Sequence, residues 1–243
     1  MTLSQAESAV SLNQLSLWSG REWVLKNLTV EIRSGSFCVL LGANGAGKSS
    51  LLKLVAGVLQ SPWAREGALC VPQVEQGASR FLGIGWLPQS MPFCEDMSVR
   101  EFLEVSKGDG APFDVRSLLR DFELEILLSS RLSTLSGGQW QRVRLAQVLA
   151  KPSRILLLDE PDTALDARWR AALWHMLREK HRQGVTIVVS AHRFSEIESF
   201  ATDWIGLCEG RLVFSVSHQG VCPQAYVDRL FLGKVLDSLN LLG

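Results

Sequence analysis

The sequence contains no long apolar run and no recognisable leader segment. No stretch approaches the ~18 to 20 apolar residues that a helix needs to span a bilayer. The N-terminus, MTLSQAESAV, has no basic region followed by an apolar run, so it does not resemble a signal peptide. We therefore expect the protein to stay in the cytosol. If it acts at a membrane, another chain must hold it there.

A basic excess and paired cysteines are also missing. The 25 basic residues are matched by 25 acidic ones, whereas non-specific nucleic-acid binding normally needs a surplus of positive charge. We therefore predict no nucleic-acid partner. The cysteines form no CxxC pair and no zinc-like cluster with histidine, so we expect them to be reduced and mostly buried. They are Cys38, Cys70, Cys94, Cys208 and Cys222.

The apolar pattern of the chain alternates between strand and helix signals, which predicts a parallel sheet. The 243 residues suffice for one large α/β domain or two small ones. Continuous apolar runs predict buried strands at 37–41, 155–158 and 185–190. Helical periodicity and stop signals predict a helix over about 136–150 and another that ends near Gly184.

Other segments give weaker signals. Residues 10–18 and 24–32 are typical of short strands around a turn at Ser19 and Gly20. Residues 60–86 favour short strands and loops, and residues 98–130 favour helix. A helix is predicted to begin at Lys48, with one apolar face made by Leu51, Leu52, Val55, Val58 and Leu59.

The segment GANGAGKS, residues 42–49, fits the phosphate-loop pattern GxxxxGK[ST] between a buried strand and an amphipathic helix. Glycines let the backbone curl and point several N–H groups at one anion, and the helix adds its positive N-terminus. Lys48 can reach the β- and γ-phosphates, and the Ser49 hydroxyl can hold Mg²⁺. The predicted nucleotide-binding residues here are Gly42, Asn44, Gly45, Ala46, Gly47, Lys48, Ser49 and Ser50.

Two acidic residues, Asp159 and Glu160, end the apolar strand pattern ILLL. A carboxylate at the carboxyl end of a strand beside a phosphate loop can bind the magnesium shell, which is the role predicted for Asp159. Glu160 is then placed to orient and polarise an attacking water molecule.

The segment LSGGQ, residues 135–139, predicts a second anion site. Ser136 has the character of a helix cap, and two following glycines leave backbone amides uncovered. The predicted nucleotide-binding residues in this segment are Ser136, Gly137, Gly138 and Gln139.

These motifs, in this order, make the chain resemble ABC ATPases over about residues 10–215. The resemblance assigns Gln89, in LPQ, as the Q-loop glutamine that senses Mg²⁺ and water. It assigns TALD, residues 163–166, as the D-loop and His192 as the switch histidine that contacts the γ-phosphate. It also places Trp18 where the family stacks an aromatic ring on adenine, whereas Trp140 is expected to pack under the signature helix.

The resemblance implies a single nucleotide-binding domain over residues 1–243. Its fold would be α/β, of the P-loop NTPase type, with a RecA-like, mostly parallel core sheet, an antiparallel β subdomain and a helical signature subdomain. The core would comprise about 1–89 and 152–243, and the helical subdomain about 90–151. The implied chemistry is hydrolysis of ATP with Mg²⁺, with Glu160, His192, Gln89 and Lys48 as catalytic residues and Ser49, Gln89 and Asp159 as metal ligands.

The resemblance also implies partners. Two copies would pair head to tail, with each ATP between the phosphate loop of one copy and residues 136–139 of the other. The pair would dock on a polytopic permease at the cytoplasmic face of the inner membrane, supplied indirectly by a substrate-binding protein. The predicted docking surface lies near residues 89–93 and 97–105, which carry the apolar cluster Met91, Pro92, Phe93 and Met97.

Several alternatives stay open. Residues 139–146 resemble the corresponding stretch of vitamin B12 importers, so the favoured function is import of a metal chelate or cobalamin. Import of zinc or manganese is the second hypothesis, and export is the third. ATPases of DNA repair insert a coiled coil before the signature, and no heptad run occurs here. Translation factors carry two ATPase units in one chain. Asp162 and Arg193 depart from the residues usual in the family, but neither removes a catalytic group.

Overall fold

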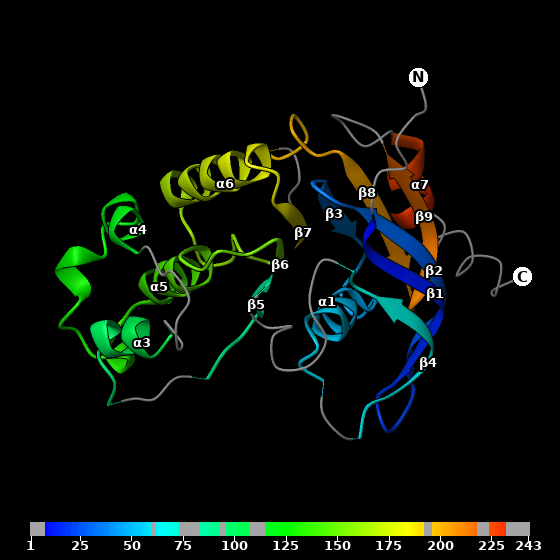
Figure 1. Cartoon of the computed structure of the whole chain (residues 1–243), viewed down its shortest axis with the longest axis horizontal. Helices are drawn as coiled ribbons and strands as arrows, with labels where there is room; N and C mark the ends of the chain where they lie inside the picture. Colours follow the sequence, from blue (N-terminus) through cyan, green and yellow to red (C-terminus); the bar gives the residue numbers. More distant parts are fainter. Residues whose placement is uncertain are drawn as a thin grey trace, which may run out of the picture.

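The structure is a computed structural model that describes residues 8–59, 62–72, 83–92, 96–106, 115–191, 196–217 and 224–231. It contains a six-stranded core sheet and a three-stranded antiparallel sheet, with helices around them (Figure 1). No helix in the described ranges is long and apolar enough to cross a membrane.

The core sheet has the order β5-β6-β7-β3-β8-β9, in which only β9 runs antiparallel to its neighbour. Its central strands are buried on both faces, as expected for parallel strands covered on both sides. The strands are β3 (Phe37–Leu41), β5 (Ile84–Leu87), β6 (Ile155–Asp159), β7 (Thr186–Ser190), β8 (Asp203–Cys208) and β9 (Arg211–Ser217).

The smaller sheet has the order β2-β1-β4, from β1 (Ser8–Trp18), β2 (Trp23–Arg33) and β4 (Ala64–Cys70). The predicted turn at Ser19 and Gly20 joins β1 to β2. This sheet packs with α1 (Lys48–Ala56) against one face of the core sheet, where Cys38 and Leu40 point. The alternate residues Phe37, Val39 and Leu41 face the opposite core.

The helices of the middle of the chain gather on one side of the molecule, to the left of Figure 1. They are α3 (Val99–Val105), α4 (Arg116–Asp121), the 3-10 turns Glu125–Leu127 and Leu132–Thr134, and α5 (Gly137–Leu149). α6 (Ala167–Arg182) packs on the same core, and α7 (Gln224–Phe231) lies against β8 and β9. The division into a core and a helical subdomain at residues 90 and 151 stays a prediction.

One expectation from the sequence is wrong, and the burial of the cysteines agrees only in part. Val58 does not share the buried face of α1, because Gly57 adopts a left-handed conformation with φ 74° and ends the helix before it. Its side chain is 39% exposed. Of the three cysteines that the structure describes, all free, Cys38 is buried as expected, whereas Cys208 is half-buried and Cys70 is exposed. Cys94 and Cys222 lie outside the described residues.

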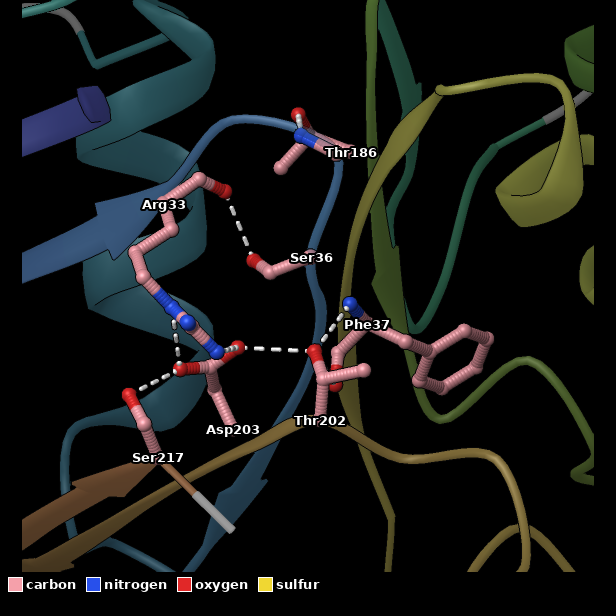
Figure 2. A network of polar contacts seen from close by, with 8 residues as sticks. Arg33, Ser36, Phe37, Thr186, Thr202, Asp203 and Ser217 are labelled. Atoms are coloured by element: carbon pink, nitrogen blue, oxygen red, sulfur yellow. Dashed lines mark hydrogen bonds and ion pairs between the residues drawn. The ribbon is translucent and has the colours of Figure 1, made fainter. Parts of the chain in front are cut away.

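A polar network at the amino ends of the core strands joins the two sheets (Figure 2). Arg33, at the end of β2, donates through Nε and Nη2 to the two carboxylate oxygens of Asp203 at 3.1 and 3.0 Å. Ser217 and Thr202 donate to the same carboxylate at 2.6 and 2.7 Å. The network fixes the antiparallel sheet to β8 and β9.

Candidate nucleotide-binding site

The phosphate loop runs from the end of β3 to the start of α1. Gly47 has φ 104°, and a Cβ there would lie 2.7 Å from Leu25 Cδ2, so this position requires glycine. A Cβ on Gly42 would lie only 2.4 Å from the Leu207 carbonyl oxygen. The N-cap residue of α1 is Gly47, which has no side chain to cap the helix, so the first amides are available to an anion.

Lys48 is buried at the start of α1, and its ammonium group is held by the loop itself. Nζ donates to the carbonyl oxygens of Gly42 at 2.7 Å and Ala43 at 3.2 Å. Burial lowers the pKa of Lys48, and the nearby Glu160 and Asp159 carboxylates oppose that shift. Both carboxylates thus favour the charged form of the Lys48 ammonium.

Asp159, the last residue of β6, is fully buried. Ser190, its partner in register on β7, donates from Oγ to Asp159 Oδ1 at 2.7 Å. No described residue donates to Asp159 Oδ2, although this oxygen is also buried. A buried carboxylate oxygen without a donor suits a hard cation, and the oxygens of Ser49 and Gln89 belong to the same class of ligand. The residues therefore fit Mg²⁺.

Glu160 leaves the strand in a left-handed conformation with φ 49°, which is uncommon for a residue with a side chain. Its backbone N–H donates to Ser190 Oγ at 2.9 Å. Its carboxylate accepts a hydrogen bond at 3.1 Å from Nε2 of Gln89, two residues beyond β5. Because β5 and β6 are parallel, the two side chains meet at the carboxyl edge of the sheet.

The signature segment caps α5 as predicted. Ser136 Oγ accepts from the Gln139 N–H at 3.3 Å, and Gln139 Oε1 accepts from the Ser136 N–H at 2.8 Å. A Cβ on Gly138 would lie 2.9 Å from the Ala164 carbonyl oxygen, so glycine here permits close approach to the D-loop. The contacts of the described residues thus place this segment against its own D-loop and not against its own phosphate loop.

The two singled-out tryptophans differ. Trp18, at the end of β1, is half-buried, and its ring meets Trp23 edge to face with centroids 5.5 Å apart. Its role under adenine stays a prediction. Trp140 packs edge to face on Phe102 at 5.1 Å, as expected of a packing residue. His192 and Phe93 lie outside the described residues.

Sequence reasoning missed three residues of this region. Ser190 connects Asp159 to Glu160, and Gln141 and Arg144 are buried beside the Q-loop. Gln141 and Arg144 share one face of α5 with Leu145 and Val148. Two polar residues on an otherwise apolar face are a signal that the sequence contains.

Comparison with known proteins decides the family. Residues 25–163 match the family model described as ABC transporter. The chain is 32% identical over 231 residues to the ferric enterobactin transport ATP-binding protein FepC of Escherichia coli, covering 90% of this chain and 85% of that protein. It is 34% identical over 231 residues to the hemin import ATP-binding protein HmuV of Shewanella denitrificans, covering 87% and 89%.

This chain belongs to the ABC transporter family. Its fold agrees with that of an ATP-binding cassette solved as a post-hydrolysis dimer bound to ADP and Pi, with TM-score 0.73 and 25% identity. That likeness covers 87% of this chain and 100% of the other. The chain is therefore an ABC ATPase, an enzyme that binds and hydrolyses ATP.

Proposed function

We propose that this ABC ATPase is the motor of an importer and works as two copies docked on a membrane permease. The buried Asp159, whose Oδ2 has no donor among the described residues, supports the ATPase part of this proposal. Similarity to two transport and import proteins carries the import part. The relatives FepC and HmuV are transport and import proteins by name, and the chain covers most of the length of each.

The roles of the residues follow from their chemistry. Lys48 leaves the Gly42 and Ala43 carbonyls and binds the β- and γ-phosphates, while the loop amides cradle them. Ser49, Gln89 and Asp159 would hold Mg²⁺, which neutralises charge on the transferred phosphoryl group. Glu160, steadied by Gln89, orients and polarises the attacking water, and His192 contacts the γ-phosphate.

A second copy completes the site. The capped start of α5 leaves the amides of Gly137 and Gly138 without a partner from the cap itself. Since this segment lies against its own D-loop, we infer that it serves the phosphates held by the other copy. The dimeric cassette with ADP and Pi supports the pairing of two copies.

The permease would dock near residues 89–93 and 97–105. Met91 and Met97 are partly buried against the core, so these two side chains offer less exposed apolar surface than the sequence predicted. Val105 and Pro92 are exposed and remain available to a partner. The docked motor would lie on the cytoplasmic face of the inner membrane.

The proposed cargo is a metal chelate, cobalamin or a related compound delivered by a substrate-binding protein. FepC and HmuV carry names that refer to two iron chelates, ferric enterobactin and hemin, which favours this class. Zinc or manganese import, and export, are the alternatives.

The test is purification of the tagged chain from native membranes in mild detergent, followed by transport in vesicles. A polytopic permease should copurify, and ATP on the motor side should drive uptake of a radiolabelled iron chelate. Lys48→Ala should copurify equally and transport nothing. ATP-driven movement in the outward direction, or recovery with ribosomes instead of a permease, would overturn the importer proposal.

A further inference from the structure

Two polar side chains, Gln141 and Arg144, are buried in α5 although most of that helix face is apolar. They are only 6% and 4% exposed. Arg144 Nη1 donates to Gln141 Oε1 at 2.9 Å and to the Gln89 carbonyl oxygen at 3.4 Å, and Nη2 donates to the Pro88 carbonyl. Gln141 Nε2 donates to the Pro161 carbonyl at 2.7 Å. We call these bonds the Arg144–Gln141 link.

The Arg144–Gln141 link and the hydrogen bond between Gln89 and Glu160 together form a closed ring of contacts. Pro161 directly follows Glu160 in the chain, and the Gln89 side chain donates to the Glu160 carboxylate at 3.1 Å. The backbones beside both members of that contact are therefore held by the same helix. That helix, α5, begins at the signature segment, so a shift of the signature would be transmitted to Gln89 and Glu160.

Stability alone gives a poor account of Arg144. Every hydrogen-bond partner that the described residues give it is neutral, and its Nε has none. Burial lowers its pKa, yet a guanidinium stays protonated in proteins, so a buried charge remains. An apolar side chain of similar size would avoid that cost of desolvation. What an apolar residue lacks is the rigid fork that reaches two backbone carbonyls and an amide at once.

We propose that Arg144, acting through Gln141, is a positioning residue that holds Gln89 opposite Glu160 and ties both to the signature helix. The proposal rests on the roles given above to Gln89 and Glu160. It predicts that loss of the link slows hydrolysis and leaves ATP binding intact, because the phosphate loop is not part of the ring.

The experiment measures ATPase kinetics and thermal stability of Arg144→Met. We expect kcat per folded molecule to fall by about 10-fold to 10²-fold, the range for a small misplacement of reacting groups, with KM for ATP nearly unchanged. Thermal stability is measured to show how much of each variant is folded. Arg144→Lys, which keeps the charge but not the fork, should give an intermediate kcat. It also serves as the test if Arg144→Met does not fold.

Arg142→Met is the matched control on the same helix. Burial also lowers the pKa of Arg142, but this guanidinium donates to the Phe122 carbonyl and lies 4.2 Å from the centroid of the Trp169 indole. It takes no part in the Arg144–Gln141 link. It should keep the wild-type ratio of kcat to KM per folded molecule.

A double-mutant cycle separates positioning from general damage. If Arg144 acts through the Gln89–Glu160 pair, Arg144→Met should lower kcat little further in a Gln89→Ala background. Full additivity, an unchanged kcat in both Arg144 variants, or an equal loss in Arg142→Met would each overturn the proposal. If Gln89→Ala and Glu160→Gln alone leave kcat unchanged, the roles assigned under the proposed function fail instead.

Discussion

The two ends of the core sheet each bury one carboxylate, and the protein satisfies them differently. At the amino end, Asp203 is 7% exposed, and both its oxygens accept hydrogen bonds from neighbouring side chains (Figure 2). At the carboxyl end, Asp159 is fully buried, and only one of its oxygens has a donor among the described residues.

This difference separates a structural site from a functional one. A buried carboxylate that is completed by protein donors stabilises the fold and needs nothing more. A buried carboxylate with an unmatched oxygen is costly until a cation arrives, and it lies near Lys48 and Glu160. We infer that the amino end holds the two sheets together and that the carboxyl end is left incomplete for ligand.

The largest expected effect lies at the carboxyl end. Glu160→Gln should lower ATP turnover by about 10² to 10⁴-fold, because it removes the proposed general base. ATP binding should persist, and an ATP-bound dimer should accumulate. Phosphate release and sedimentation measure the two outcomes.

Glu123→Gln is a suitable control for that variant. Glu123 also has a left-handed backbone, with φ 49°, but it pairs with Arg168 at the surface. It should turn over normally. Near-normal turnover in Glu160→Gln as well would remove Glu160 from the mechanism.

At the amino end the expected loss is in stability. Asp203→Asn should lower the free energy of unfolding by about 1.5 to 3 kcal/mol, the range for hydrogen bonds to charged groups. The ATPase rate per folded molecule should stay unchanged. Asp159→Asn should lower the ATPase rate per folded molecule and leave the free energy of unfolding unchanged. ATPase assays and urea unfolding measure the two properties. If both variants lose the same property, the two ends do not differ as described.

Trp18 tests the adenine contact. Trp18→Ala should weaken ATP binding by about ten-fold, on the scale of 1 to 3 kcal/mol for base stacking, and Trp18→Tyr should be tolerated. Trp23→Ala is the matched control, because its ring lies edge to face with Trp18. Fluorescence titration with ATP would measure the affinities. A larger loss in Trp23→Ala would move the contact to that residue.

The smallest effect concerns His181, which lies beside the amino-end network and packs on Phe37. Burial lowers its pKa below the ordinary 6.5, so the unfolded chain takes up the proton first. The stabilising contribution is therefore present above that pH and is lost as pH falls through it toward the folded pKa.

His181→Gln should flatten this part of the profile of unfolding free energy against pH. His175→Gln, an exposed position on the same helix, should not. An unchanged slope in His181→Gln would show that another group titrates there.

The motifs of the carboxyl end could be predicted because their chemistry is local. The phosphate loop, the Asp159–Glu160 pair and the Ser136 cap each lie within a few consecutive residues, and their flanking strands and helices follow from simple periodicity. Capping by Ser136 is confirmed by the structure, as are the strands at 37–41 and 155–158.

The remaining features depend on tertiary contacts that the linear pattern does not reveal. The role of Ser190 depends on the pairing of β7 with β6. The role of the Arg144–Gln141 link depends on the packing of α5 beside the Q-loop. The pair of Arg33 and Asp203 joins residues far apart in the chain. The predicted apolar face of α1 extends too far, because the left-handed Gly57 ends the helix before Val58.

The most direct test of the incomplete carboxyl end is binding of Mn²⁺, as a spectroscopic substitute for Mg²⁺, in the presence of ATP. Electron paramagnetic resonance would compare wild type, Asp159→Asn and Asp203→Asn. We predict a protein-bound Mn²⁺–ATP signal in wild type and Asp203→Asn, and loss or marked weakening of it in Asp159→Asn. An unchanged Mn²⁺ affinity and spectrum in Asp159→Asn would contradict the account.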